Sequence, residues 1–119
     1  MRNRYVSLCV LAVACHVGAA MAINLRFLRN TPISRFNEQD NQLLQAAFVK
    51  AMNEEPDGSQ VEWRNDRTGA GGTITPTGSF ERQGAKCRKA QFTTYYKTLN
   101  GGGEYSFCQN AQGTWQLVQ

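Results

Sequence analysis

The apolar residues of this chain recur at two different spacings, and each spacing predicts a different kind of element. Between Ser34 and Pro56 they recur at steps of three and four residues, which is typical of a helix with one buried face. Ser34 or Asn37 can cap the start of this helix, and Pro56 and Gly58 stop it. We therefore expect a helix over about residues 37–54. Its apolar face consists of Leu43, Leu44, Ala47, Phe48, Ala51 and Met52.

The part of the chain that follows this helix alternates between apolar and polar residues, with turn residues at short intervals. Its longest strand candidate runs from Lys86 to Lys97, and Asn100-Gly101 is the strongest signal for a hairpin turn. Pro76 limits the strand before it to the edge or the end of a sheet. The strand candidates cover residues 61–64, 73–75, 79–82, 86–97, 105–108 and 114–118. These patterns predict an α+β fold, in which one N-terminal helix packs on a small antiparallel meander sheet of four to five strands.

A cluster of glycines from Gly69 to Gly72 raises the question of phosphate binding. A phosphate loop needs the N-terminus of a helix directly behind its glycines, so that backbone amides converge on the anion. Here Thr73-Ile74-Thr75-Pro76 follows, which favours a strand, and no P-loop lysine is present. We therefore interpret the cluster as a turn between two strands, in which glycine supplies a positive φ.

The first 22 residues have the composition of a secretory signal peptide. Arg2 and Arg4 precede an apolar run of suitable length, and Ala20-Met21-Ala22 supplies a cleavage site with small residues. The sequence thus divides into a signal peptide (1–22), an extended leader or short edge strand (23–33) and a folded domain (34–119).

A second processing route competes with this cleavage. Ala12-Val13-Ala14-Cys15 loosely matches a bacterial lipoprotein box, in which Cys15 would carry the lipid. An uncleaved anchor is a third possibility. All three routes place the domain outside the cytoplasm.

Removal of the signal peptide changes the chemistry that is available. Without Arg2 and Arg4, the thirteen basic residues fall to eleven, against nine acidic residues, so the domain is only weakly basic. His16, the single histidine, is lost as well. The mature chain then lacks Ser-His and Cys-His pairs and histidine metal sites. Because Glu54, Glu55 and Asp57 are interpreted as a solvated rim at the end of the helix, we expect no enzymatic activity, no cofactor and no metal.

Cys87 and Cys108 remain in a chain bound for an oxidising compartment, which predicts a disulfide between them. A hairpin centred on Asn100-Gly101 would instead place Cys108 opposite Thr93, out of reach of Cys87. Either the loop at the glycines is wide and off-centre, or a bulge resets the register, or the bond joins strands that are not neighbours.

Basic and aromatic residues are interleaved between Phe80 and Lys97. Such a strip can bind single-stranded nucleic acid, but export and weak net charge argue against that partner. We interpret the aromatic residues as core and the charges, Arg88 included, as the solvated face. We also expect Trp63 and Trp115 to be core residues on neighbouring strands.

Several of these residues resemble the C-terminal domain of the 17 kDa surface-antigen family of Gram-negative bacteria, over roughly residues 34–119. The residues that carry the resemblance are Phe36, Asp40, Ala46, Ala47, Trp63, Asn65, Thr68, Gly69, Gly72, Phe80, Gly84, Cys87, Arg88, Cys108, Gly113 and Trp115. The resemblance implies a small envelope protein, commonly lipid-anchored, without an assigned reaction. Many members carry a glycine-zipper segment before this domain, and Gly18-Ala19-Ala20 is the only trace of one here.

These observations favour a non-catalytic exported protein with a binding or scaffolding role in the periplasm, at the outer membrane or at the cell surface. Its expected partner is an envelope component or another protein, with no nucleic acid, and a membrane only if Cys15 is lipidated. The alternative is a small exported inhibitor, for example of lysozyme, that presents a charged side chain on an exposed loop. Arg67 and Lys97 are the candidate surface contacts in that case.

Overall fold

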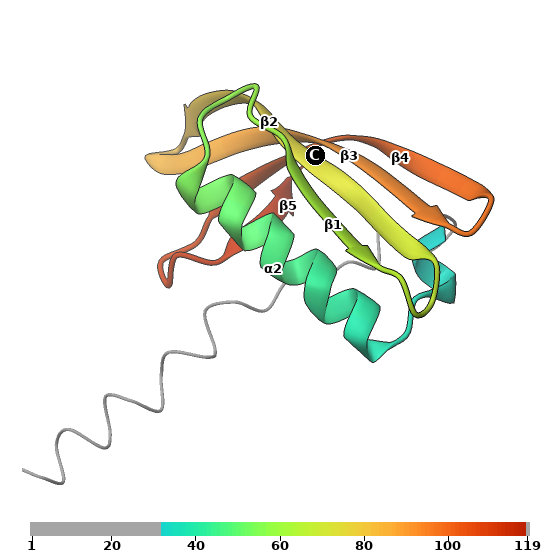
Figure 1. Ribbon diagram of the computed structural model, residues 1–119. Helices are drawn as coiled ribbons and strands as arrows, with labels where there is room; N and C mark the ends of the chain where they lie inside the picture. Colours follow the sequence, from blue (N-terminus) through green and yellow to red (C-terminus); the bar gives the residue numbers. More distant parts are fainter. Residues whose placement is uncertain (1–31, 119) are drawn as a thin grey trace, which may run out of the picture.

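A computed structural model describes residues 32–118, which form one helix and a five-stranded antiparallel sheet (Figure 1). A short 3-10 helix, η3, begins the described part, and the sheet follows the α-helix in the sequence. The elements are η3 (Pro32–Arg35), α2 (Glu38–Glu54), β1 (Val61–Asn65), β2 (Ala70–Arg82), β3 (Ala85–Tyr96), β4 (Leu99–Gln109) and β5 (Trp115–Val118). The predicted α+β fold is therefore confirmed. The signal peptide and most of the predicted leader lie outside the described residues.

The strands follow one another across the sheet in the order β1-β2-β3-β4-β5, as expected for a meander. All neighbouring pairs are antiparallel. The sheet is curled, and α2 lies across one of its faces (Figure 1). This arrangement places two sets of connections at opposite ends of the molecule. The β1–β2 and β3–β4 turns lie at the end where α2 begins, and the β2–β3 and β4–β5 turns lie where it ends.

The helix has the predicted limits and the predicted buried face. Asn37 is its N-cap, because its side chain accepts a hydrogen bond from the backbone N–H of Asp40 at 2.8 Å. In return Asp40 Oδ2 accepts from the backbone N–H of Asn37 at 3.0 Å, which completes a capping box. Of the predicted apolar face, all residues except the half-buried Leu43 are fully buried against the sheet.

The core between helix and sheet is rich in aromatic side chains. Phe48 of α2 stacks on Phe92 of β3 and meets the edge of Phe107 of β4, with ring centroids 5.9 and 5.0 Å apart. Trp63 and Trp115 are both buried, with 6% and 4% of their surface exposed, so their assignment to the core is confirmed. The expectation that they lie on neighbouring strands is wrong. Trp63 is on β1 and Trp115 on β5, the two edges of the sheet.

The helix reaches both edges, and this explains how two such distant tryptophans share one core. At the start of α2, Phe36 meets Trp63 edge-on, with centroids 5.3 Å apart. At the other end, Trp115 Nε1 donates a hydrogen bond to Asn53 Oδ1 at 2.9 Å. The helix therefore fastens β1 at one end and β5 at the other.

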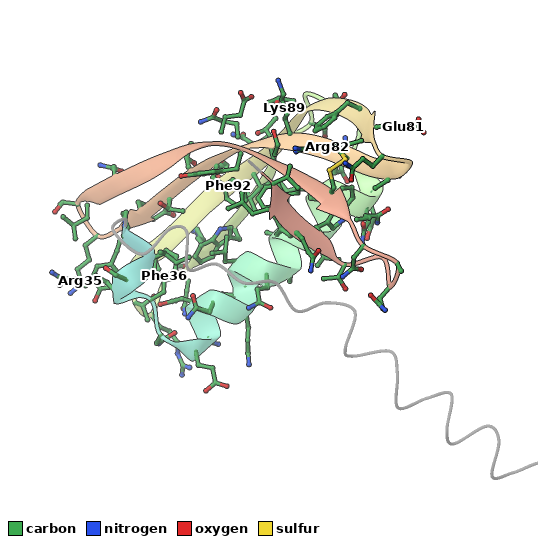
Figure 2. The ribbon with its side chains drawn as sticks, turned by 180° about the vertical axis from the view of Figure 1, so that it is seen from behind. Arg35, Phe36, Glu81, Arg82, Lys89 and Phe92 are labelled. Atoms are coloured by element: carbon green, nitrogen blue, oxygen red, sulfur yellow. A yellow bond between two sulfur atoms is a disulfide. The ribbon has the colours of Figure 1, made fainter. Side chains whose placement is uncertain are left out.

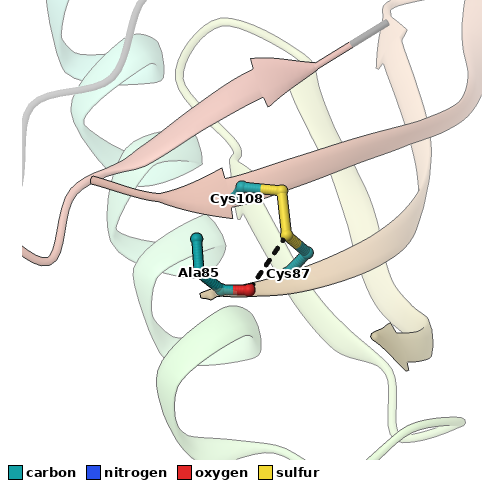
Figure 3. The surroundings of a disulfide bond; sticks show 3 residues. All are labelled: Ala85, Cys87 and Cys108. Atoms are coloured by element: carbon teal, nitrogen blue, oxygen red, sulfur yellow. Dashed lines mark hydrogen bonds between the residues drawn. A yellow bond between two sulfur atoms is a disulfide. The ribbon is translucent and has the colours of Figure 1, made fainter. Parts of the chain in front are cut away.

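The disulfide between Cys87 and Cys108 is present, and it corrects the predicted hairpin turn (Figure 3). The two cysteines are directly opposite each other on β3 and β4. The turn is the two-residue Lys97-Thr98 segment, because Tyr96 pairs with Leu99. Asn100 and Gly101 are not a turn but part of β4. None of the three proposed arrangements was needed, since a turn three residues earlier brings the cysteines into register without a bulge.

A single long strand replaces two of the predicted short ones. Residues 73–75 and 79–82 both belong to β2, which continues through Pro76 by a register shift between Pro76 and Gly78. The proline is tolerated because β1 pairs with β2 only up to Ile74, so that Pro76 has a strand neighbour on one side only. Its carbonyl oxygen accepts a hydrogen bond from the backbone N–H of Gly58 at 2.7 Å.

The glycine cluster lies at the β1–β2 hairpin, as predicted, but among Gly69, Gly71 and Gly72 only Gly69 lies in the turn and has a positive φ. Gly69 has a φ of 80° in the β1–β2 turn. Gly71 and Gly72 lie inside β2, contrary to the expectation that they belong to the turn. A side chain on Gly71 would collide with the Tyr95 hydroxyl, and one on Gly72 with the carbonyl oxygen of Thr93.

Candidate functional site

The first polar cluster lies where α2 begins and centres on Asp40, whose side chain is fully buried. Asp40 Oδ1 accepts hydrogen bonds from Asn65 Nδ2 and Thr68 Oγ1, both at 2.8 Å. Its Oδ2 accepts from the backbone of Asn37, as described above. A buried carboxylate with this many donors is a structural tie rather than a free acid or base. It fixes the β1–β2 turn to the start of the helix.

The second polar cluster lies where α2 ends and centres on Arg88 of β3. Arg88 was expected on the solvated face, and this is wrong, since only 6% of the residue is exposed. Its Nη1 donates to the carbonyl oxygens of Ala51 and Met52, at 3.1 and 2.8 Å. Its Nη2 contacts Asp57 Oδ1 at 2.7 Å. A guanidinium suits this place because the last carbonyls of a helix carry partial negative charge and can accept further donors. Ala51 O accepts from Arg88 in addition to the backbone N–H of Glu55.

The sequence contains a signal that could have placed Arg88 correctly. Side chains two residues apart on a strand point to the same face, and Arg88 is in phase with Ala90, Phe92 and Thr94, all of which are buried. Asp57 was assigned to a solvated rim, but its side chain is only 41% exposed and pairs with Arg88. The prediction placed Arg88 on the solvated face because of its positive charge. The alternation of buried and exposed residues along the strand predicts its burial correctly.

Several of the residues that carry the family resemblance lie in or beside these two clusters. At the start of α2, Phe36 contacts Trp63, and Asp40 accepts hydrogen bonds from Asn65 and Thr68. At the other end, Arg88 and Trp115 hold the end of α2. The disulfide from the neighbouring Cys87 joins β3 to β4. These members of the signature thus fasten the helix to the sheet at both of its ends.

The two predicted surface contacts, Arg67 and Lys97, lie on neighbouring turns at one end of the molecule. Arg67 is in the β1–β2 turn and Lys97 in the β3–β4 turn, and both are exposed. The turns touch, because the backbone N–H of Lys97 donates to the carbonyl oxygen of Gly69 at 2.8 Å. Arg35 of η3 lies at the same end, opposite the end that carries Arg82 and Lys89 (Figure 2). Among residues 32–118, no carboxylate forms an ion pair with Arg35, Arg67 or Lys97.

An exposed apolar side chain accompanies these cations. Leu99, directly after the β3–β4 turn, is 47% exposed, and Leu117 is the other large hydrophobic residue of the described part that is exposed. Lys97 Nζ lies 5.3 Å from the centre of the half-buried Tyr96 ring, a cation–π contact. We refer to Arg35, Arg67, Tyr96, Lys97 and Leu99 together as the basic tip. The sequence analysis identifies Arg67 and Lys97 as surface contacts but does not identify Arg35, Tyr96 and Leu99.

A shallow hollow of about 420 Å³ lies beside the irregularity of β2, at the other end of the molecule. Its lining offers one ammonium group, two hydroxyls and part of an aromatic ring, but no carboxylate. The lining residues are Thr77, Gly78, Ser79, Phe80 and Lys89. This set lacks the paired acid and base that hydrolysis or group transfer needs.

Within residues 32–118, no three histidine, cysteine or acidic side chains gather in a way that could hold a metal ion. The same residues include no helix of the length and hydrophobicity that a bilayer crossing requires. Cys15, the predicted lipidation site, and the predicted cleavage site after Ala22 lie outside the described residues.

Comparison with known proteins gives one consistent family. The sequence profile of the 17 kDa outer membrane surface antigen family matches residues 50–116. Proteins named 17 kDa surface antigen from Rickettsia bellii, Rickettsia prowazekii and Rickettsia conorii are each 33% identical over 88 residues, which cover 69% of this chain and 52% of the relative. The chain therefore spans about half the length of the curated relatives that it matches. No solved structure is detectably similar to it.

Proposed function

Because the chain belongs to the 17 kDa outer membrane surface antigen family, we propose that it is a non-catalytic domain of the bacterial envelope. In this role it is exported and binds or scaffolds another envelope component at the outer membrane or in the periplasm. The relatives are named as surface antigens, a name that describes where a protein is exposed and not a reaction.

This proposal rests on the structural role of the two buried charged residues. Asp40 and Arg88 are the two buried charged residues of the described part, and the hydrogen bonds of both hold α2 to the sheet. Catalytic groups are expected to converge on a pocket with perturbed or unpaired side chains. The hollow at Lys89 has no such convergence. A rigid, stapled scaffold that presents its loops fits binding better than chemistry.

The test is fractionation of a Gram-negative host that expresses the full chain, combined with the intact mass of the protein recovered. We expect the chain in the periplasmic or membrane fraction, starting either at Ile23 or at an acylated Cys15, with Cys87 and Cys108 protected from alkylation. A chain that starts at Met1 and stays in the cytoplasmic fraction would contradict the proposal.

A second candidate function rests on the placement of Arg67 and Lys97. The two cationic side chains lie on adjoining turns, and an exposed arginine is a common anchor residue of protein interfaces. Lysozyme is a suitable target because its cleft contains carboxylates. If the chain is an inhibitor, it blocks lysozyme at near-stoichiometric ratios and Arg67→Ser weakens the block. Undiminished lysozyme activity with excess protein rejects this candidate and leaves the envelope proposal intact.

A further inference from the structure

We propose that the basic tip is a contact surface for the phosphate headgroups of an anionic lipid bilayer. This inference rests on the envelope role proposed above and adds the part of the molecule that faces the membrane. Three features of the described residues carry it: the charge at the tip, the leucine beside that charge, and the position of Pro32.

The charge at this end is in excess and unpaired. Arg64 and Asp66 form an ion pair at 3.2 Å, and both side chains are largely exposed, so this pair adds no net charge. Arg35, Arg67 and Lys97 remain. The carboxylates at the start of α2 are Glu38, which is exposed, and Asp40, which is fully buried and accepts only from neutral donors. Against these two negative charges, the three cations leave this end with a net charge of +1. Each cation held near an anionic membrane contributes on the order of 1 kcal/mol.

The tip also has the amphipathic composition of a membrane interface. Leu99 exposes its side chain next to Lys97, and Lys97 lies over the Tyr96 ring. At a bilayer surface a leucine enters the acyl boundary, while tyrosine and lysine stay at the level of the headgroups. A partner that offered only carboxylates, such as an acidic peptide, would make no use of an exposed leucine in this place.

The chain joins the described part at the same end. Pro32 begins η3, which lies beside the β1–β2 and β3–β4 turns (Figure 1). A membrane attachment on the residues before Pro32 would therefore join the described part at the end that carries the basic tip. The tip would then meet headgroups whenever such an attachment holds the domain at the membrane. One weak anchor and a basic patch together bind more firmly than either alone.

The molecule supplies a matched control for the test. The tip variant carries Arg67→Ser, Lys97→Asn and Leu99→Ser. The control variant carries Lys86→Ser, Lys89→Ser and Leu117→Ser, which removes the same charge and the other exposed leucine far from the tip. Asn is chosen at residue 97 because the φ of Lys97 is 55°, a conformation that Asn tolerates.

All proteins are made as the full chain with Cys15→Ser, so that no acyl chain at that position masks the difference. The processed proteins are mixed with phosphatidylcholine vesicles, with and without phosphatidylglycerol, and the bound fraction is measured by flotation at low salt. We expect the tip variant to bind the anionic vesicles about tenfold or more weakly than the parent, and the control variant to bind as the parent does. Added salt should remove most of the difference.

Three outcomes would overturn the proposal: equal binding by all proteins, equal losses in the two variants, or parental binding to neutral vesicles that matches binding to anionic ones. Circular dichroism and the thermal midpoint of each variant establish that it is folded. These outcomes are separate from failure of the envelope proposal, because fractionation of the unmodified chain is measured independently of vesicle binding.

Discussion

Asp40 is the single residue on which the start of the helix depends most. Its replacement by alanine leaves the donors of Asn65 and Thr68 without their acceptor in a buried place and opens the capping box. Since an unsatisfied buried donor costs about 1–3 kcal/mol, we expect Asp40→Ala to lower the free energy of unfolding by about 2–4 kcal/mol. Urea unfolding followed by circular dichroism measures this change.

The control for that experiment is Glu38→Ala in the same turn of α2. Glu38 is exposed and interacts mainly with the helix dipole, so its loss should cost less than about 1 kcal/mol. Equal effects of the two substitutions would mean that Asp40 acts only through the dipole.

Arg88 has the corresponding role at the end of the helix. Arg88→Met keeps the length of the side chain but removes the donors to Ala51, Met52 and Asp57. Arg88 Nε is buried without a partner among the described residues, which lowers the net contribution of the guanidinium. We therefore expect a loss of about 2–3 kcal/mol in the free energy of unfolding.

Lys89→Met is the matched substitution on the adjacent, exposed residue. It should change stability by no more than about 0.5 kcal/mol in the same urea titration. A neutral Arg88→Met would show that packing of the methylene groups, and not the hydrogen bonds, holds the end of α2.

At the scale of elements, the β2–β3 turn contains a residue, Gln83, whose type does not suit its backbone conformation. Gln83 and Gly84 both have positive φ, 52° and 80°, and glutamine seldom adopts this conformation. Asn is well suited to the first position of such a turn, so we expect Gln83→Asn to raise the free energy of unfolding by about 0.5–1 kcal/mol. The thermal midpoint should rise accordingly.

Gln112→Asn provides the comparison, because Gln112 lies in the β4–β5 connection and its φ is not positive. The same chemical change should leave the midpoint nearly unmoved there. A rise of similar size in both variants would mean that the backbone conformation of Gln83 is not the cause.

The elements themselves could be predicted because they follow from local patterns. The helical spacing from Leu43 to Met52 and the alternation from Lys86 to Lys97 gave limits within a residue or so of those observed. The β3–β4 turn was misplaced because Asn100-Gly101 is a strong local signal, whereas Lys97 gives almost none. The two cysteines predict the correct turn if they are assumed to lie opposite each other on neighbouring strands. The midpoint between Cys87 and Cys108 then falls between Lys97 and Thr98, which are the two residues of the observed turn.

The polar clusters could not be predicted in the same way, because their members are far apart in the sequence. Asp40 falls in the first turn of the predicted helix over residues 37–54, but Asn65 and Thr68 reach it only through the packing of α2 on β1. The basic tip has the same origin. Arg67 and Lys97 lie thirty residues apart in the sequence, and the pairing of the strands brings their turns together.

At the scale of the whole molecule, the disulfide is the main covalent support of a small domain. Removing it with Cys87→Ser and Cys108→Ser relieves a constraint on the unfolded chain and should cost about 2–4 kcal/mol, or roughly 10–20 °C in the thermal midpoint. Calorimetry or circular dichroism of the double variant and the parent measures the shift.

Reducing agent supplies the control for this prediction. Under full reduction the parent should unfold at about the midpoint of the double variant, whose own midpoint should not respond to the reagent. A parent that is insensitive to reduction would show that the bond between β3 and β4 contributes little.

The meander order has a consequence for the way in which the domain folds. In the described part each strand pairs with its neighbour along the chain, so each strand pairing is a hairpin and no other strand lies between the two partners. Cys87 and Cys108 belong to one hairpin, and its zippering alone brings their sulfurs together. Oxidation can therefore follow folding as a late sealing step that requires no rearrangement of the strands.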